Sequence, residues 1–224
     1  MMSETVMTNH LVAHHYSVCV IDIGSPKLGN LGWYLWDATR QRVASGDDLD
    51  ALFEPLIQAS DQSGVLLGLE APLFVPIRQD LLLMTKARAG ESPRPWSAGA
   101  GAQVLAMNLP IMTYLFQQLQ IRQANLSYCI ESTDFTAKPG QVLLFEALVS
   151  GANKGSSHID DAKIMVDYCR SYSDQSQLPP TILQHEAGTT FLNLAACALL
   201  HLGLIETQAL SGCSSPIYRP DYRP

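Results

Sequence analysis

The stretch Ser17–Asp37, SVCVIDIGSPKLGNLGWYLWD, decides the fold because it holds two apolar runs on either side of a glycine-rich turn. The first run, Ser17–Ile23, has the composition of a buried strand, and the chain becomes strand-like again over Trp33–Asp37. The glycines between the runs, through Gly32, allow the tight backbone of a hairpin. The domain is therefore predicted to begin with two antiparallel strands.

The rest of the chain alternates between strand-like and helix-like segments. Gln41–Ser45 is predicted as a short third strand, and apolar residues recur at helical spacing over Leu49–Ala59. The apolar runs Val65–Glu70 and Val142–Ala147 are predicted as further strands, with Ser127–Ile130 as a weaker alternative to the latter. Further helices are predicted over 104–120, 159–171 and 189–204. A strand meander followed by strand–helix alternation predicts an α/β fold, with a mixed sheet flanked by helices.

The composition is that of one globular domain. Apolar residues make up 47% of the 224 residues and charged residues 16%, which excludes a disordered chain. This length fits a single domain with a substantial core. We expect a flexible leader over residues 1–16, the domain over residues 17–205 and an irregular, proline-containing arm over residues 206–224.

The charge and the cysteines limit the classes of function. The formal net charge of −7 excludes a general electrostatic attraction to nucleic acid or to an anionic membrane, so a nucleic acid or nucleotide partner must be held by a local basic patch or by metal. No apolar run reaches the roughly 18 residues of a membrane span, and the N-terminus lacks the pattern of a secretory signal. Five scattered cysteines without a C-x-x-C pair predict free thiols in a cytoplasmic protein. A homodimer stays open as an alternative to a monomer.

Three acidic residues stand in or at the end of apolar strands, where a charge is costly unless it is paired or binds a cation. They are Asp22 in VCVIDIG, Glu70 in VLLGLEAP and Glu146 in VLLFEAL. Each alone is more often a solvated or capping residue. Carboxylates that converge from several strands, however, are what a phosphoryl-transfer site dependent on Mg²⁺ or Mn²⁺ needs. Together the three residues predict a metal centre.

A fourth carboxylate is expected from a helix that lies across the sheet. The candidates are Asp160 and Asp161 in SSHIDDAK and Glu186 before the last helix, and we favour Asp161. The alternative for the first two is that acids in the first turn of a helix stabilise its dipole after an N-cap such as Ser157. His158 is a candidate proton shuttle beside Asp161, although a surface position at a helix start is the simpler interpretation.

Basic and aromatic residues suggest where a substrate would bind. The segment Arg88–Gly101 carries Arg88 and Arg94, which could bind phosphate, and Trp96, which could stack on a base. The alternative is a solvated loop with an aromatic anchor. Lys154 could hold a scissile phosphate by its point charge, but a lone exposed lysine usually only increases solubility.

Five motifs of this chain occur in the same order in a known family. They are VIDIGSPKLGNLGWYLWD, LGLEAPLFVPIR, RAGESPRPWSAGAG, LLFEALVSG and LNLAACALLHLG, within residues 17–204. In these motifs the chain resembles an uncharacterised family of predicted RNase H-like nucleases. The resemblance implies an RNase H-like mixed sheet of five strands, with Asp22 on the first, Glu70 on the fourth and Glu146 on the fifth, all directed at one cation site.

The chain departs from that family near the start of its last helix. Where the family commonly has an aspartate, this chain offers Asn193, which is uncharged and a weak metal ligand. If that alignment holds, a second metal is lost and catalysis is reduced or absent. Alternatively, Asp160 or Asp161 fills the position, because a strand, a loop and an acidic helix in this order also fit Holliday-junction-resolvase-like enzymes of the same fold.

Three functions follow as hypotheses. The preferred one is a metal-dependent nuclease or phosphodiesterase of RNase H-like fold, in which Asp22, Glu70, Glu146 and Asp161 bind Mg²⁺ or Mn²⁺. The competing hypothesis is a catalytically inactive domain that uses the same sheet to bind a nucleotide, a small ligand or a protein partner. A distant third is an actin-like nucleotide-binding role, because Gly24 and Ser25 imitate a phosphate-binding turn, but the chain is too short for the two domains such enzymes need.

Overall fold

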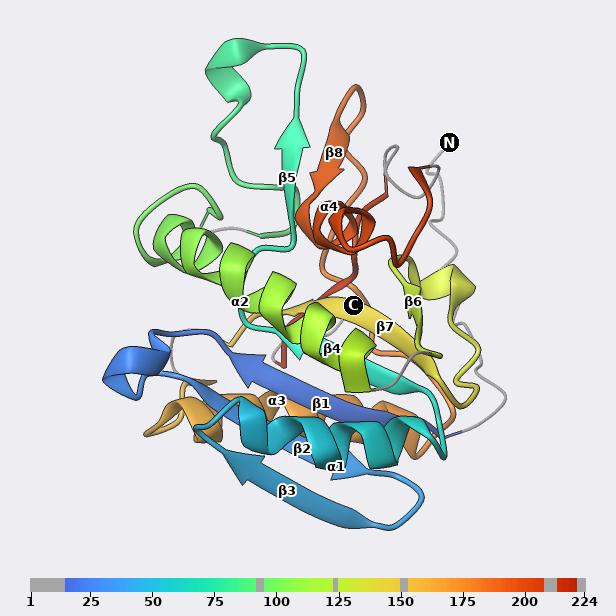
Figure 1. The fold of residues 1–224 in the computed structure, drawn as a ribbon. Helices are drawn as coiled ribbons and strands as arrows, with labels where there is room; N and C mark the ends of the chain where they lie inside the picture. The colour runs from blue at the N-terminus through green and yellow to red at the C-terminus, as the bar shows by residue number, and fades with distance from the viewer. Residues whose placement is uncertain (1–14, 92–94, 123–124, 150–152, 208–212, 221–224) are drawn as a thin grey trace.

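Seven strands form one mixed sheet in the computed structural model, which describes residues 15–91, 95–122, 125–149, 153–207 and 213–220 (Figure 1). The strands follow the order β3-β2-β1-β4-β7-β6, and β9 also pairs with β7. The first three strands are an antiparallel meander, whereas β4, β6, β7 and β9 join it through parallel pairings. Their bounds are β1 Ser17–Asp22, β2 Gly32–Asp37, β3 Arg42–Gly46, β4 Val65–Leu69, β6 Ser127–Cys129, β7 Gln141–Ala147 and β9 Ile217–Tyr218.

The α/β architecture with a mixed sheet is as predicted, but the described part of the chain has seven strands in this sheet and not five. The extra strands are short. The segment 127–129, expected only as an alternative to the strand over 142–147, forms β6 beside it, so both segments are strands. The other addition, β9, comes from the C-terminal segment.

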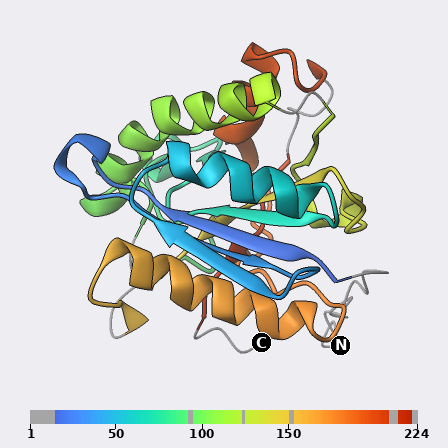
Figure 2. The same ribbon diagram turned by 60° about the horizontal axis from the view of Figure 1, so that its bottom comes forward.

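Helices cover both faces of the sheet (Figure 2). The helices α1 (Asp50–Ser60) and α2 (Ala100–Arg122) lie over one face, and α3 (His158–Ser173) lies over the other. A short helix, α4 (Leu194–His201), packs against α2. Three 3₁₀ turns complete the helical elements of the described residues, at Pro26–Leu28, Leu81–Leu83 and Ser132–Asp134.

Alternation along the strands divides the apolar residues between two cores. In β1, Cys19 and Ile21 belong to the core under α1 and α2, whereas Val18 and Val20 belong to the core under α3. This period of two is the geometry of a strand that is buried on both faces. It also decides the position of the acidic residues, because Asp22 continues the row of Val18 and Val20 on the face of α3.

The last predicted helix begins later than its apolar pattern indicates. Residues Thr190–Asn193 form β8, which pairs antiparallel with β5 (Phe74–Ile77) in a separate two-stranded sheet. The helix α4 then starts because Asn193 is its N-cap, with Oδ1 accepting a hydrogen bond from the Ala196 amide at 2.9 Å. An asparagine at this position satisfies an amide that the helix itself leaves unpaired.

Both ends of the domain reach further than the sequence indicates. Tyr16, assigned to the leader, is fully buried, and its hydroxyl donates to the Gln177 carbonyl at 2.6 Å. At the other end, the expected irregular arm includes β9, whose Ile217 and Tyr218 are buried beside β7. Residues 1–14 of the expected leader lie outside the described part of the chain.

Within the described residues, no helix combines the length and the apolar character needed to cross a bilayer.

Candidate metal centre

Two of the predicted acidic residues lie side by side where β1 and β4 end. The strands are parallel, with Ile21 opposite Leu69, and the Glu70 amide donates to the Ile21 carbonyl at 2.9 Å. Asp22, the last residue of β1, and Glu70, the residue after β4, therefore lie at the same level of the sheet. In open α/β sheets, ligands bind in the crevice outside these carboxyl ends of the strands.

The N-terminus of α3 supplies the third carboxylate. Ser157 is the N-cap of α3, as predicted, and its hydroxyl accepts a hydrogen bond from the Asp160 amide at 3.1 Å. The helix can approach the sheet closely because Gly32, opposite Asp22 in the hairpin, has no side chain. A Cβ there would lie 2.4 Å from the Ile159 nitrogen. Glycine at this position is thus explained by helix packing as well as by the hairpin.

The carboxylates of Asp22, Glu70 and Asp161 form one group, which we call the carboxylate cluster. One ligand oxygen of each lies within 4.8 Å of the others. Asp22 and Asp161 are buried, and the Glu70 side chain is 12% exposed. Three carboxylate oxygens at such separations suit a hard divalent cation such as Mg²⁺ or Mn²⁺.

Two basic side chains contact the cluster. Nδ1 of His158 lies 2.5 Å from Oδ2 of Asp22. Nζ of Lys154 donates to Oδ2 of Asp161 at 3.0 Å and lies 3.5 Å from Oε1 of Glu70. The remaining oxygen of Asp161, Oδ1, accepts from the Gly155 amide at 2.6 Å, whereas the buried Oε2 of Glu70 has no hydrogen-bond partner among the described residues.

Burial and mutual repulsion disfavour full ionisation of this cluster. Burial, followed by the charge of Asp22, raises the pKa of Glu70 to about 9. The pKa of Asp22 is also raised by burial, against the opposing effect of His158 and Lys154. Burial alone would lower the pKa of Lys154, but the charges of Glu70 and Asp161 raise it. A divalent cation would favour the ionised carboxylates and relieve both effects.

The structure separates the two adjacent acids at the start of α3. Asp161 is buried in the cluster, whereas the Asp160 carboxylate is turned to solvent and accepts from the Ser156 hydroxyl at 2.5 Å. Hydrogen bonds from Ser156 and Ser157 lower the pKa of Asp160. Asp160 thus has the helix-start role that the sequence offered as an alternative. Glu186 is elsewhere, paired with Arg78 at 2.9 Å.

Glu146 differs from the prediction, because the structure does not bring it into the cluster. It lies opposite Leu69 and not opposite Glu70, so it continues the row of Val142 and Leu144 toward the face of α1 and α2. There, Oε1 accepts from Arg88 at 2.6 Å, and Oε2 accepts from Arg88 at 2.8 Å and from the Leu73 amide at 3.1 Å. A shift of one residue along a strand reverses the face that a side chain occupies.

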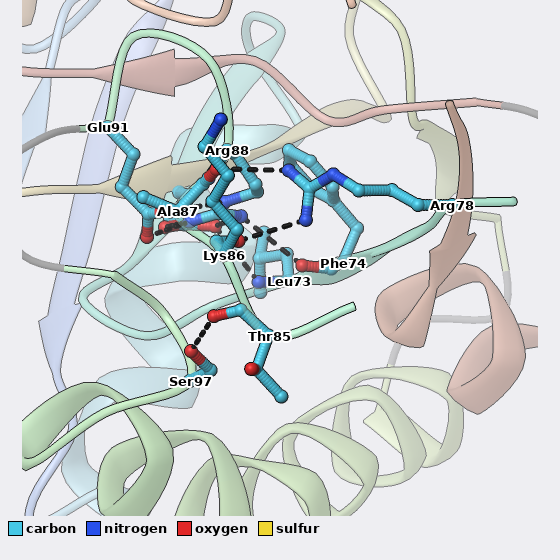
Figure 3. Close-up of polar contacts among 10 residues, drawn as sticks. Leu73, Phe74, Arg78, Thr85, Lys86, Ala87, Arg88, Glu91 and Ser97 are labelled. Atoms are coloured by element: carbon cyan, nitrogen blue, oxygen red, sulfur yellow. Dashed lines mark hydrogen bonds and ion pairs between the residues drawn. The ribbon is translucent and has the colours of Figure 1, made fainter. Parts of the chain in front are cut away.

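Arg88 also differs from its predicted role as a phosphate ligand. It is 2% exposed and binds Glu146 and Glu91, with the Arg88–Glu91 pair at 2.8 Å. It further donates to the Phe74 carbonyl at 3.2 Å and stacks over the Phe74 ring (Figure 3). The guanidinium of Arg88 therefore holds the segment after β5 against the sheet. This explains why it is buried and charged: both neighbouring carboxylates raise its pKa although burial opposes this.

Arg78 has a similar role nearer to β5. It donates to the carbonyls of Lys86 and Ala87 (Figure 3). It also donates to the carbonyl of Leu83 and to the carboxylate of Glu186. The long segment after β5 thus has its backbone organised by two arginines. Arg94 lies outside the described residues.

A cavity of about 490 Å³ lies beside the cluster. Asp22, Glu70, Lys154 and His158 form one part of its lining, and most of the remainder is apolar and includes Trp96. The structure therefore brings Trp96 and Lys154, two of the predicted substrate ligands, to the same cavity as the cluster. Arg88 is not among the described lining residues, because it is buried in its ion pairs with Glu91 and Glu146.

Asn193 has a structural role apart from the carboxylate cluster. Besides capping α4, its Nδ2 donates to the Ser215 hydroxyl at 3.1 Å. The amide oxygen thus caps α4, and the amide nitrogen connects α4 to the C-terminal segment. The helical carboxylate of the cluster comes from α3.

His158 is closer to the carboxylate cluster than its sequence context indicates. Its signal is the spacing of His158 and Asp161, three residues apart, which places both side chains on one face of a helix. Because Ser157 is the N-cap, that face belongs to the first turn, next to the sheet.

Comparisons of this chain with known protein families, with curated proteins and with solved structures give no match. The arguments for function therefore rest on the geometry of the site.

Proposed function

We propose that the protein is a metal-dependent phosphodiesterase or nuclease of RNase H-like fold, with Mg²⁺ or Mn²⁺ held by Asp22, Glu70 and Asp161. The observation that carries the proposal is the convergence of these three carboxylates, within 4.8 Å, from two parallel strands and a helix. Support for the RNase H-like assignment comes from the antiparallel meander joined to parallel strands, with Asp22 ending the first strand and Glu70 directly after the fourth.

The free Oε2 of Glu70 supports a cation ligand set over a purely structural one. Buried polar atoms in folded proteins nearly always have a partner, and an unpaired one costs about 1–3 kcal/mol. Within the part of the chain that the structure describes, Oε2 of Glu70 is buried without such a partner, and the pKa of this carboxyl is raised to about 9. Both features are those of a functional site in which a ligand completes the interactions.

In this proposal the cation and each of the surrounding side chains have separate chemical roles. A bound divalent cation supplies polarisation of the phosphate and a lower pKa for a bound water. Asp22, Glu70 and Asp161 hold it by carboxylate oxygens, and the charge of Lys154 faces the space in which a phosphate would lie. His158 orients Asp22 through its Nδ1 contact and is in a position to accept or donate a proton at the mouth of the site.

Replacement of one ligand tests the proposal. We expect Asp22→Asn to abolish hydrolysis of a generic phosphodiester in Mn²⁺ while the protein stays folded, because the amide keeps the shape but loses the negative charge. Hydrolysis is measured at matched protein concentration, and folding by circular dichroism. The control is Asp160→Asn, one residue from the cluster and turned to solvent, which should retain activity. Equal activity of Asp22→Asn and the wild type would contradict the proposal.

The position of Lys154 favours a second candidate, a non-catalytic binding domain. Its Nζ lies 3.0 Å from Asp161 and 3.5 Å from Glu70, so the lysine already supplies one positive charge to the cluster. In such a protein the carboxylates would be held by this ammonium group, and Mg²⁺ or Mn²⁺ would leave the melting temperature unchanged. A rise in melting temperature with millimolar Mn²⁺ that is lost in Asp22→Asn would exclude this candidate.

We retain a cytoplasmic location as part of the proposal. It is supported by the five cysteines, none of which forms a disulfide bond within the described residues.

A further inference from the structure

The cavity beside the carboxylate cluster has two chemically different parts. The charged part contains Asp22, Glu70, Lys154 and His158. The other part is lined largely by apolar and small residues, among them Trp96, Gly99 and Val104; it also contains Glu91 and Glu146, whose carboxylates are both paired with Arg88. A ligand that fills this cavity must therefore carry an apolar, preferably flat, group close to a charged one.

The volume limits the size of that ligand. About 490 Å³ is within the range of roughly 300–1,000 Å³ that accommodates small molecules and cofactors. It suits one nucleotide unit. Trp96 supplies an aromatic surface of the kind on which nucleobases stack in sites that bind single strands.

The charge distribution argues against a long duplex. A protein that binds a duplex backbone needs several cations that each neutralise a phosphate. Among the described lining residues Lys154 is the one lysine or arginine, and its ammonium group already contacts Asp161 and Glu70. The whole chain carries a net charge of −7. Affinity must come from the metal, Lys154 and the apolar part of the cavity together.

We propose that this site takes a single unpaired nucleotide, with its phosphate at the carboxylate cluster and Lys154 and its base in the apolar part of the cavity against Trp96. This proposal rests on the proposed phosphodiester chemistry for its choice of phosphate. The nucleotide is either free or the unpaired end of a strand, since both present the same base and phosphate. A base within a duplex would have to leave its stack to enter.

Calorimetric titration of the full chain in Mg²⁺ tests the proposal with three probes. They are a nucleoside 5′-monophosphate, ribose 5-phosphate, which has the phosphate without the base, and a short single-stranded oligonucleotide with its duplex form as the comparison. We expect the monophosphate or the single strand to bind at least about tenfold more tightly than ribose 5-phosphate and the duplex, from the stacking contribution of one base. The tighter of the two identifies the source of the nucleotide.

Trp96→Ala locates the base. Loss of one base–aromatic contact is expected to weaken binding by roughly 5- to 150-fold, with little effect on ribose 5-phosphate. Leu82→Ala is the control, since Leu82 is 88% exposed and does not line the cavity. Unchanged folding of both variants is checked by circular dichroism, and Trp96→Phe, which keeps an aromatic surface, should retain most of the affinity.

The outcomes distinguish this inference from the proposed function. Base-dependent binding that Trp96→Ala weakens, in a protein with no hydrolysis, would support the nucleotide pocket and contradict the enzyme. Metal-dependent hydrolysis with equal affinity for ribose 5-phosphate and the monophosphate would support the enzyme and overturn the pocket. Equal affinity for single strand and duplex, or no binding of any probe that contains a base, would also overturn it.

Discussion

Glu70→Gln should stabilise the metal-free protein, although it replaces a residue of the candidate site. The Glu70 carboxyl is largely buried beside Asp22 and Asp161, and no described residue forms a hydrogen bond with its Oε2. Ionising it in the folded protein is therefore costly. Glutamine has nearly the same shape and carries no charge at any pH, so the substitution removes this cost.

The magnitude follows from the pKa. Burial and the charge of Asp22 raise the pKa of Glu70 from 4.5 to about 9 in the folded protein. Below about pH 4.5 both folded and unfolded states are protonated and the stability associated with this group is fully present. As the pH rises toward 9 the unfolded state ionises first, and stability is lost at up to about 1.4 kcal/mol per pH unit. At pH 7 the variant should exceed the wild type by roughly 3 kcal/mol in free energy of unfolding.

Urea unfolding in EDTA between about pH 5 and about pH 9 measures this difference. The gap between variant and wild type should widen with pH and then level off above about pH 9. Glu54→Gln, an exposed glutamate on α1, is the control and should show no such trend. Added Mn²⁺ should reverse the order at pH 7, because at 1,000 times its Kd it stabilises the wild type by roughly 4.1 kcal/mol and binds the variant poorly. A constant difference across the pH range would refute the reasoning.

Two further predictions concern Arg88 and Asn193, which the sequence analysis connected with the active site and which have structural roles in the folded protein. Arg88→Leu should lower the free energy of unfolding by about 3–5 kcal/mol, because Glu91 and Glu146 would be left buried without their partner; Lys163→Met, which breaks the exposed pair with Asp167, should cost no more than about 0.5 kcal/mol. Urea unfolding checks both, and a stable Arg88→Leu with lost activity would instead favour a substrate ligand. Asn193→Ala should cost about 1–2 kcal/mol through loss of the α4 cap and its contact with Ser215, and thermal melting should show the same Mn²⁺-induced rise as in the wild type.

The strands that carry the cluster could be predicted from sequence because they are continuous apolar runs. Residues 17–22 and 65–69 are buried on both faces, so composition alone marks them as strands. The start of α3 was equally clear from its serine cap and first-turn acids. Asp22, Glu70 and Asp161 stand at these locally determined points. Their meeting in space follows from the parallel pairing of β1 with β4 and from the packing of α3 against β1.

Long-range partners are what local patterns could not supply. The short strand β9 and the buried position of Tyr16 depend on contacts with segments far away in the sequence. Similarly, β8 replaces the first turn of the predicted final helix because it pairs with β5. Arg88 looked like a free cation in a glycine-rich segment, since nothing in its neighbourhood shows that Glu146 lies against it.

For Glu146 the strand is as predicted, but the structure places the side chain outside the predicted site, because local sequence does not determine the register of β7. Its strand, its place at the strand end and its burial all agree with the prediction. The register opposite Leu69 nevertheless turns its side chain away from Asp22 and Glu70, and an arginine from the segment after β5 neutralises it. The third carboxylate of the cluster comes from α3 instead, which can reach the sheet because residue 32 is glycine. Glu146 and Glu70 thus lie near the same strand ends, but the unfavourable burial of a charge is compensated at one of them and not at the other. Glu146 has a permanent guanidinium partner, whereas Glu70 keeps an unsatisfied oxygen, and this difference is why the cluster at Glu70, and not the pair at Glu146, is the place to look for a metal ion.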